Sequence, residues 1–287
     1  MAAPPGAAPA TDWLARLEQF DVVGSTNDIV AGWLREGTPE VCVAIAGEQL
    51  AGRGRNGRAW TAPAGASLLL SVGFRPTWLE PAQAWRLGAV VSLAMAEAAE
   101  AAAQLPAGSV SLKWPNDLVI LDASVAGGAG VRKVAGVLGE TEGLGTEGPQ
   151  AVIGIGINVD WARGSFPAEF AAGMTSLSEA AGGHAVSHVE NQVVGRDAVA
   201  AAFLQRLAPL VDGLRAGQFP ADAWRDRQLT NGLPVRLEWP DGTAEAVIAV
   251  DVDPDSGALL VRPMGRDSVT RAVLVGEIRH LRLGGVI

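Results

Sequence analysis

Four apolar, β-branched segments in the middle of the chain follow one another with no helical pattern between them. They occupy residues 110–114, 117–121, 133–141 and 150–159, and two similar segments lie upstream at 40–47 and 66–75. A doubly wound parallel sheet needs strands that alternate with helices, and this succession does not supply them. We therefore predict an α+β domain whose sheet is mixed or largely antiparallel.

Helical patterns lie around these strands. A long helix is predicted at about 81–104, and a helical region runs from 164 to about 229, clearest at 197–214 and again at 219–228. Near the N-terminus, Ser25 is predicted to cap a helix that includes residues 29–34, with Asp28 three residues after the cap. A helix N-terminus also offers N–H donors and hydroxyls to a polar ligand, so this segment has a second possible use.

The pattern changes after Asn231 and Gly232 to short strands separated by turns. These strands are predicted at 233–239, 244–250, 258–262 and 269–274. Short strands at this spacing with little helix predict a small β-barrel. The predicted organisation is therefore a disordered tail at 1–10, a large domain at 11–230 and a small β domain at 231–287.

Composition excludes several classes of protein. The 287 residues are 48% apolar, enough for a sizeable core, and the longest apolar segment, 87–105, is interrupted by Glu97 and Glu100, so no membrane span is predicted. The N-terminus lacks the features of a signal peptide, and the net charge of −9 argues against general nucleic-acid binding. Cys42 is the single cysteine and cannot form a disulfide or zinc site alone, so a cytoplasmic location is the default.

Residues 47–60 contain an unusual loop in which glycine and arginine alternate. Glycines let the backbone approach a ligand, and each guanidinium offers a rigid fork for phosphate or carboxylate. The alternative is a solvated or nucleic-acid-binding loop. Predicted strands flank the loop on both sides and anchor it to a packed domain, which favours an anion site. The loop residues concerned are Gly52, Arg53, Gly54, Arg55, Gly57, Arg58 and the closing Trp60.

Two further segments carry groups suited to chemistry. Residues 113–117, Lys-Trp-Pro-Asn-Asp, place an ammonium, an amide and a carboxylate around a proline, although a simple turn between strands is the alternative. In 154–158, Gly-Ile-Gly-Ile-Asn, the two glycines indicate close approach of the backbone by packing or by a ligand. Only two of the 22 basic residues are lysines, Lys113 and Lys133, and both lie within motifs, which favours a role in a tight site.

The Gly/Arg loop, the 113–117 segment, the segment 132–139 (Arg-Lys-Val-Ala-Gly-Val-Leu-Gly) and the 154–158 strand occur in the order seen in the biotin protein ligase family, which the chain resembles. Gly276, Glu277 and Ile278 also resemble part of that family's C-terminal module. The resemblance implies a catalytic domain like that of class II aminoacyl-tRNA synthetases and an SH3-like C-terminal domain. About twenty residues precede the catalytic pattern, so we expect a single-function ligase without the DNA-binding domain that some members carry.

The activity implied by the resemblance has two steps. Biotin's carboxylate attacks the α-phosphate of ATP, with Mg²⁺, to give biotinyl-5′-AMP, and a lysine of a biotin carboxyl carrier domain then takes the biotinyl group. Arginines, a lysine and Mg²⁺ suit this reaction because they neutralise charge where one anion attacks another. The nearest alternative is a lipoate ligase, which shares the fold and the adenylate intermediate. A non-catalytic anion- or nucleic-acid-binding module is less favoured, because the chain is acidic outside the loop.

The resemblance also assigns roles to individual residues. Lys133 is expected to bridge biotin's carboxylate and the phosphate, Asp117 to guide the incoming amine, and Arg55 to face phosphate as a third catalytic group. Biotin contacts are implied for Ser25, Thr26, Asn27, Gln49, Gly52, Arg53, Gly54, Arg55 and Lys133. ATP contacts are implied for Arg55, Arg58, Trp60, Lys113, Asn116 and Asn158.

Two departures from the family pattern stand out. Residues 122–130 make the connection between Asp117 and Lys133 longer than the family's usual tight hairpin, so the assignment of Lys133 rests on its own local motif. Asn56 occupies a loop position that is commonly basic in the family. One positive charge fewer is expected to weaken the grip on the adenylate.

Overall fold

The computed structural model describes residues 11–122, 130–184, 194–265, 269–274 and 276–280. The predicted tail at 1–10 and most of the long connection at 122–130 lie outside the described residues. Among the described residues, no helix combines the length and the apolar character needed to cross a membrane.

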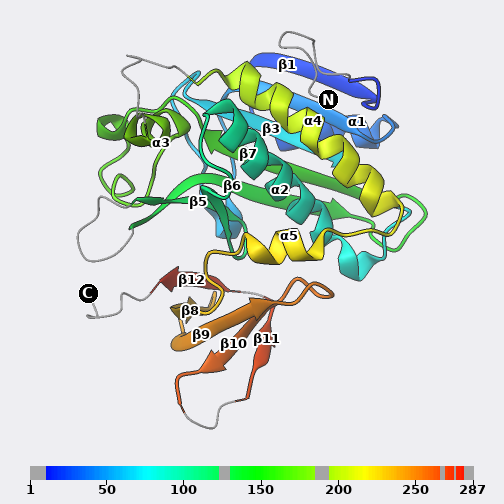
Figure 1. Cartoon of the computed structure of the whole chain (residues 1–287). Coiled ribbons are helices and arrows are strands. Elements are labelled where there is room, and N and C mark those ends of the chain that lie inside the picture. The colour runs from blue at the N-terminus through cyan, green and yellow to red at the C-terminus, as the bar shows by residue number, and fades with distance from the viewer. Residues whose placement is uncertain (1–10, 123–129, 185–193, 266–268, 275, 281–287) are drawn as a thin grey trace.

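A seven-stranded sheet forms the centre of the large domain (Figure 1). Its spatial order is β1 (Arg16–Val23), β2 (Cys42–Gln49), β3 (Ser67–Phe74), β7 (Gln150–Asn158), β6 (Gly130–Glu142), β5 (Asp117–Asp122) and β4 (Val110–Lys113). β1 and β2 are parallel, and the other neighbours are antiparallel. The predicted α+β domain with a mixed sheet is confirmed. β1 was not predicted, because it is a half-exposed edge strand in which polar residues interrupt the apolar ones.

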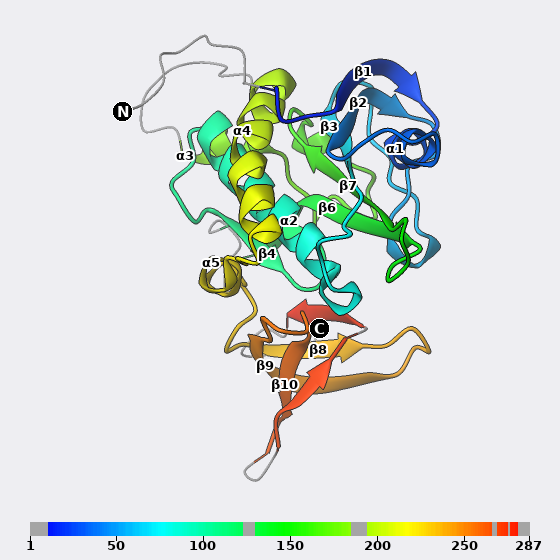
Figure 2. The same ribbon diagram turned by 90° about the vertical axis from the view of Figure 1, so that its right-hand side faces the viewer.

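Helices lie on both faces of this sheet (Figure 2). α2 (Trp85–Ala102) and α4 (Arg196–Arg215) cover one face, and α1 (Thr26–Arg35) lies on the other. α2 follows a short 3₁₀ turn at Pro81–Gln83, so the helix predicted at 81–104 is present. Ser25 occupies the N-cap position of α1, but its side chain makes no capping hydrogen bond, which corrects the predicted cap.

Strand alternation separates large from small side chains on the two faces. Leu68, Leu70 and Val72 of β3 pack in the core beneath α2 and α4, together with the isoleucines of β7. Successive residues of a strand point to opposite faces, so the intervening small residues are left on the α1 face. These are Ser71, Gly73, Gly154 and Gly156. The α1 face therefore has a low floor over which a cavity can form.

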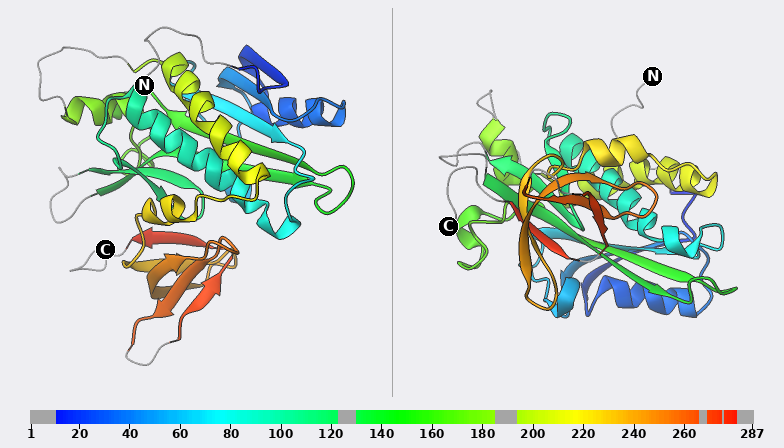
Figure 3. Two further views of the ribbon diagram at one scale, coloured as in Figure 1. Left: turned by 45° about the vertical axis from the view of Figure 1, so that its right-hand side comes forward. Right: turned by 90° about the horizontal axis from the view of Figure 1, so that it is seen from below.

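The C-terminal residues form a separate five-stranded antiparallel sheet, as Figures 1 and 3 show. Its order is β11 (Arg271–Val273), β10 (Leu259–Pro263), β9 (Ala244–Val252), β8 (Pro234–Glu238) and β12 (Glu277–His280). α3 (Leu177–His184) precedes α4, and α5 (Ala221–Asp226) leads into the small sheet. The predicted C-terminal β domain is present, and β12 is an additional strand that pairs with β8.

The turn before β10 rests against the large domain. Trp114 donates its indole N–H to the carbonyl of Gly257 at 3.1 Å, and Arg86 donates to the carbonyl of Pro254 at 3.1 Å. Gly257 has φ +73°, and a Cβ at this position would lie 2.6 Å from the Trp85 ring. Only glycine satisfies both the left-handed backbone and this close packing.

Candidate functional site

A cavity of about 570 Å³ lies on the α1 face of the large sheet. Its walls come from the N-terminus of α1, the Gly/Arg loop, the 113–117 segment, β6, β7 and residues 161–174. Glu277 and Ile278 of β12 complete the lining, so the C-terminal sheet contributes to the cavity as well.

The floor of the cavity depends on glycines. A Cβ on Gly154 would lie 2.2 Å from Asn27 Oδ1, and one on Gly156 would lie 2.5 Å from Trp60 Nε1. A Cβ on Gly136 of β6 would lie 3.0 Å from Lys133 Nζ. The close backbone approach that the Gly-Ile-Gly pattern indicated is therefore confirmed as packing against two residues that line the cavity.

One end of the cavity is polar and uncharged. Gln49 Oε1 accepts hydrogen bonds from the backbone N–H of Thr26 at 2.7 Å and from its hydroxyl at 3.0 Å. The Ser71 hydroxyl lies 2.7 Å from Thr26 Oγ1 and donates to Asn27 Oδ1 at 2.5 Å. Asn27 in turn donates to Glu140 Oε2 at 2.7 Å. These contacts fix amide and hydroxyl groups in defined orientations, which suits a ligand that has both donors and acceptors.

The Gly/Arg loop is a short hairpin with a 3₁₀ turn at Arg55–Gly57. Its base is closed by the backbone bond from Trp60 N–H to the Gly52 carbonyl at 2.9 Å. A Cβ on Gly52 would lie 2.4 Å from the Trp60 carbonyl oxygen, so this glycine is required by the closure. Asn56, at the tip, adopts φ +56°, a conformation that asparagine tolerates better than most residues.

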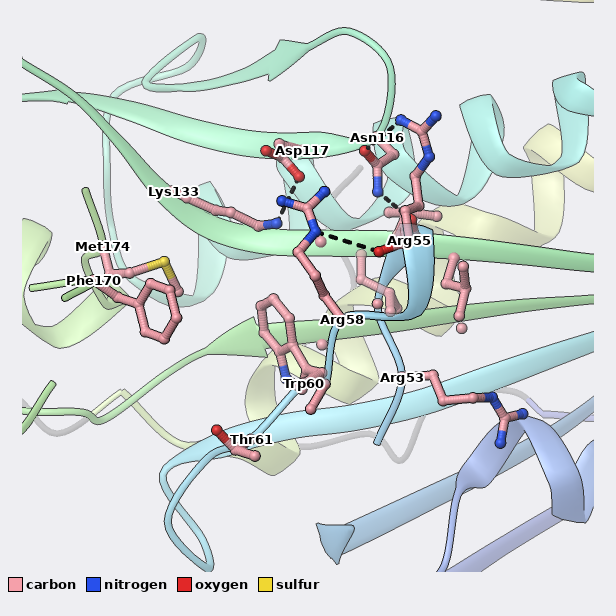
Figure 4. Close-up of a pocket in the computed structure, with 18 of the residues that line it drawn as sticks. Arg53, Arg55, Arg58, Trp60, Thr61, Asn116, Asp117, Lys133, Phe170 and Met174 are labelled. Atoms are coloured by element: carbon pink, nitrogen blue, oxygen red, sulfur yellow. Dashed lines mark hydrogen bonds and ion pairs between the residues drawn. The ribbon is translucent and has the colours of Figure 1, made fainter. Parts of the chain in front are cut away.

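Arg53 is turned toward α1 and away from the other loop arginines (Figure 4). It forms ion pairs with Asp28 at 2.7 Å and with Glu140 at 3.2 Å. The hydrogen bond from Arg53 holds the pKa of Asp28 below its usual range, and the same carboxylates raise the pKa of Arg53. Arg53 therefore ties the loop to α1 and β6.

Arg55 and Arg58 lie closer to the centre of the cavity (Figure 4). Arg55 is half-buried and donates to the neutral amide of Asn116 at 3.3 Å, and burial lowers its pKa. Arg58 pairs with the Glu277 carboxylate, which also accepts from Asn56 at 3.1 Å. A half-buried guanidinium is strongly stabilised by a bound anion, so Arg55 is well placed to hold one.

Lys133 and Asp117 meet across neighbouring strands. Their side chains form an ion pair of 2.7 Å, and Lys133 Nζ lies 5.3 Å from the centroid of the Trp60 ring. Asn116 is fixed beside them by donating to the Val137 carbonyl at 2.7 Å. The middle of the cavity is thus cationic, with one carboxylate next to the ammonium.

The other end of the cavity is apolar. Trp161 and Phe166 stack with ring centroids 4.4 Å apart and an interplanar angle of 24°. Phe170 and Met174 lie next to each other in Figure 4, and Phe170 is 57% exposed. A planar ligand group can be covered by such surfaces.

Comparisons with known proteins agree with this geometry. Residues 19–158 match the model of the biotin/lipoate A/B protein ligase family. The biotin–[acetyl-CoA-carboxylase] ligase of Mycobacterium tuberculosis is 36% identical over 92% of this chain and 90% of its own length. This chain belongs to the biotin protein ligase family. The corresponding ligase of Paracoccus denitrificans is also 36% identical, over 79% of this chain and 87% of its own length.

A solved structure supports the fold of this family member independently. The biotin protein ligase of Aquifex aeolicus, in complex with biotin and ATP, superposes with a TM-score of 0.71. The alignment covers 93% of this chain and 99% of the other, at 24% sequence identity. At that identity the superposition shows the fold, and the assignment of individual residues rests on the geometry of this chain.

Most of the predicted site residues of this family member line the one cavity. They are Ser25, Thr26, Asn27, Gln49, Arg53, Gly54, Arg55, Arg58, Trp60, Lys113, Asn116, Asp117 and Lys133. Gly52 lies at the base of the loop, behind the lining. Asn158 is fully buried, where it accepts from Ser67 at 3.2 Å and donates to the Thr175 carbonyl at 3.0 Å. Asn158 does not line the cavity, and its amide joins the end of β7 to residue 175; its nucleotide contact stays a prediction.

Several lining or supporting residues were missed by the sequence analysis. Residues 166–176, which were predicted to be helical, form turns and irregular backbone, and Phe166, Phe170 and Met174 from this segment line the cavity. Glu140 and Ser71 lie inside predicted strands, where only the alternation between faces distinguishes them from their neighbours. Glu277 was singled out only because residues 276–278 resemble part of the family's C-terminal module. Its ion pair with Arg58 depends on how the two sheets are arranged.

Proposed function

We propose that this chain is an ATP-dependent biotin protein ligase that forms biotinyl-5′-AMP and transfers biotin to a lysine of a biotin carboxyl carrier domain. The proposal rests on the order in which three kinds of surface follow one another along one cavity. A neutral polar end, a cationic middle and an aromatic end match, in order, a ureido ring, a carboxylate joined to phosphate, and an adenine. The two relatives cited are named for this activity toward acetyl-CoA carboxylase.

The polar end fits a ureido ring, which offers two N–H donors and one carbonyl acceptor. Thr26, Asn27 and Gln49 present amide and hydroxyl groups held by mutual hydrogen bonds, and we assign them to the ring together with Ser25. Lipoic acid has a dithiolane ring with no such donors. It would not use the donors and acceptors that these groups present to the cavity, and a site built to hydrogen-bond its ligand discriminates strongly against a ligand that cannot.

In the first step a carboxylate oxygen of biotin attacks the α-phosphorus of ATP, and pyrophosphate leaves with the bond electrons. The barrier comes mainly from bringing two anions together, so fixed positive charge lowers it. We assign this charge to Lys133, which contacts the carboxylate and the α-phosphate, and to Arg55 and Arg58, which face phosphate. Arg58 then has to exchange its pairing with Glu277 for the nucleotide. Lys113 and Asn116 complete the phosphate side.

In the second step the lysine amine of the carrier attacks the acyl carbon of biotinyl-5′-AMP, and AMP leaves. The amine must lose a proton to form the amide. Asp117 lies in the cavity 2.7 Å from Lys133 and is the carboxylate we assign to guide the incoming amine and hold that proton.

Trp161, Phe166, Phe170 and Met174 are assigned to the adenine end of the nucleotide. They form an apolar wall at one end of the cavity, and a purine is planar and stacks well on such surfaces. Trp60 lies between this end and the ureido end, over the floor glycines. We assign it to the face of the adenylate.

Mg²⁺ is expected to enter with ATP. Among the described residues, no group of three or more His, Cys, Asp and Glu side chains is arranged to hold a metal ion. Mg²⁺ in nucleotide enzymes is usually held by phosphates and one or two protein oxygens. Asp117 and Asn116 supply oxygens of that kind in the cavity, and bound Mg²⁺ would neutralise phosphate charge.

We also propose domain boundaries at 11–230 and 231–287, and action in the cytoplasm, where ATP and carrier domains occur together.

The proposal is tested by incubating the purified protein with Mg²⁺, ATP and either biotin or lipoate, and by measuring pyrophosphate release. We expect release with biotin and little with lipoate. Addition of an isolated biotin carboxyl carrier domain should then yield a product heavier by one biotinyl group in mass spectrometry. Release with lipoate alone would favour a lipoate ligase, and no release with either acid would overturn the proposal.

A further inference from the structure

Arg132 is a buried charge immediately beside the proposed catalytic lysine. Arg132 and Lys133 are neighbours in β6, so their side chains leave opposite faces of the strand. Lys133 lines the cavity, whereas the side chain of Arg132 is 5% exposed. The two-step reaction described above uses Lys133 and gives no role to Arg132.

Arg132 is held in place by Glu179 in the first turn of α3. Its two terminal nitrogens donate to the two Glu179 carboxylate oxygens at 2.6 and 3.1 Å, and one of them also donates to the Met174 carbonyl. Glu179 accepts a further bond from the Thr175 hydroxyl at 3.0 Å. A bidentate pair of this kind fixes orientation as well as distance.

The same region is tied to Lys133 through the backbone. The N–H of Lys133 donates to the Gly173 carbonyl at 2.7 Å, and the N–H of Thr175 donates to the Lys133 carbonyl at 2.9 Å. Met174 therefore lies beside Lys133 like a residue of a parallel strand. The segment 161–174, which forms the apolar end of the cavity, is attached to the sheet at this point by backbone bonds and by the Arg132–Glu179 pair.

We propose that Arg132 and Glu179 are positioning residues that hold the segment 161–174 against Lys133 and thereby set the affinity for the nucleotide. The inference rests on the proposed function, in which this segment covers the adenine. The ureido end of the cavity is built from α1, β2 and β3. Arg132 and Glu179 instead contact each other, Met174, Thr175 and, at 3.5 Å, Arg163, all of which belong to or adjoin the nucleotide end. Loss of the pair should therefore affect ATP and spare biotin.

The chain supplies a matched control for a merely structural ion pair. Arg227 donates to both oxygens of Glu100 at 2.8 and 3.1 Å, and the two side chains are 17% and 7% exposed. This pair joins α2 to the segment after α5 and does not line the cavity. Arg132→Lys and Arg227→Lys each keep the charge and remove the fork, so the two variants perturb similar pairs at different places.

The experiment measures the KM for ATP at saturating biotin, kcat, and the Kd for biotin without nucleotide by calorimetry. For Arg132→Lys we expect the KM for ATP to rise about tenfold, the scale of one lost charge-assisted hydrogen bond, with the Kd for biotin within twofold of wild type. Arg227→Lys should leave both constants within twofold. Thr175→Val removes only one bond to Glu179 and should raise the KM for ATP by a smaller factor, about threefold.

Two results would overturn the inference while leaving the proposed function intact. One is an unchanged KM for ATP in both Arg132→Lys and Thr175→Val, and the other is an equal weakening of biotin and ATP binding in Arg132→Lys. A circular-dichroism melt of each variant identifies any that fails to fold, and Thr175→Val then decides the question. Failure of the wild-type protein to form biotinyl-5′-AMP would instead remove the proposed function.

Discussion

Gly154→Ala is the sharpest test of how the ureido end of the cavity is built. The added methyl would lie 2.2 Å from Asn27 Oδ1 and 3.0 Å from Asn27 Cγ, whereas ordinary van der Waals contact begins near 3.4 Å. The amide therefore has to move by about 1 Å, because Gly154 lies in the middle of β7 and its strand neighbours hold the backbone.

Movement of Asn27 breaks the bonds that orient it. Its amide donates to Glu140 at 2.7 Å and accepts from Ser71 at 2.5 Å. A hydrogen bond to a charged partner contributes about 1.5–3 kcal/mol. We expect Gly154→Ala to weaken biotin binding about 10- to 100-fold. The KM for ATP, measured at saturating biotin, should change much less.

Calorimetry of biotin binding without nucleotide gives the decisive measurement. Gly32→Ala in α1 is the control, because no atom lies within 4 Å of a Cβ at that position and alanine is the better helix former. A double-mutant cycle with Asn27→Ala isolates the clash, since Gly154→Ala should cost less once the amide is gone. Wild-type affinity in Gly154→Ala, or an undiminished cost in the Asn27→Ala background, would refute the reasoning.

Three further outcomes are expected. Lys133→Arg should slow adenylate formation by about 100-fold, because a planar fork replaces a compact ammonium at the reacting groups, and should slow transfer from preformed biotinyl-5′-AMP much less; a wild-type rate of adenylate formation would move the role to Lys113. Arg55→Ala should weaken retention of biotinyl-5′-AMP by about 1.5–3 kcal/mol, seen as faster release of the intermediate in a filter-binding chase, and an unchanged off-rate would contradict its phosphate contact. Cys42 is buried, and burial raises the pKa of its thiol to about 11, so iodoacetamide at pH 8 should alkylate Cys42 far more slowly in the folded protein than in the urea-unfolded chain, and equal rates would contradict this burial.

Local pattern was enough to predict the strands that carry the site. In β7 the isoleucines face the core and the glycines face Asn27 and Trp60, which is the arrangement that strict alternation indicates. Asn158 shows what alternation alone leaves undetermined. Its side chain leaves the strand on the site's face, but Ser67 and Thr175 enclose it at the strand end.

Where a residue's position depends on contacts with distant parts of the chain, it could not be predicted from the sequence. The pairing of Arg53 with Asp28 and Glu140 joins three elements, and nothing in the loop distinguishes Arg53 from the arginines that face the centre of the cavity. Similarly, residues 166–176 have a helical composition, yet 168–173 form turns, and the backbone bonds of Gly173 and Thr175 with Lys133 tie the end of the segment to β6. In such segments tertiary contacts determine the backbone conformation and override local helix propensity.

The contact between Gly257 and two tryptophans limits how this protein can recombine with its relatives. Trp114 lies inside the motif that supplies Asn116 and Asp117, and it donates to the Gly257 carbonyl at 3.1 Å. Trp85 fills the space that any side chain at 257 would need. A chimera that takes its C-terminal domain from another ligase therefore has to bring a glycine at this turn, and a donor domain without it would disturb the active-site motif from outside.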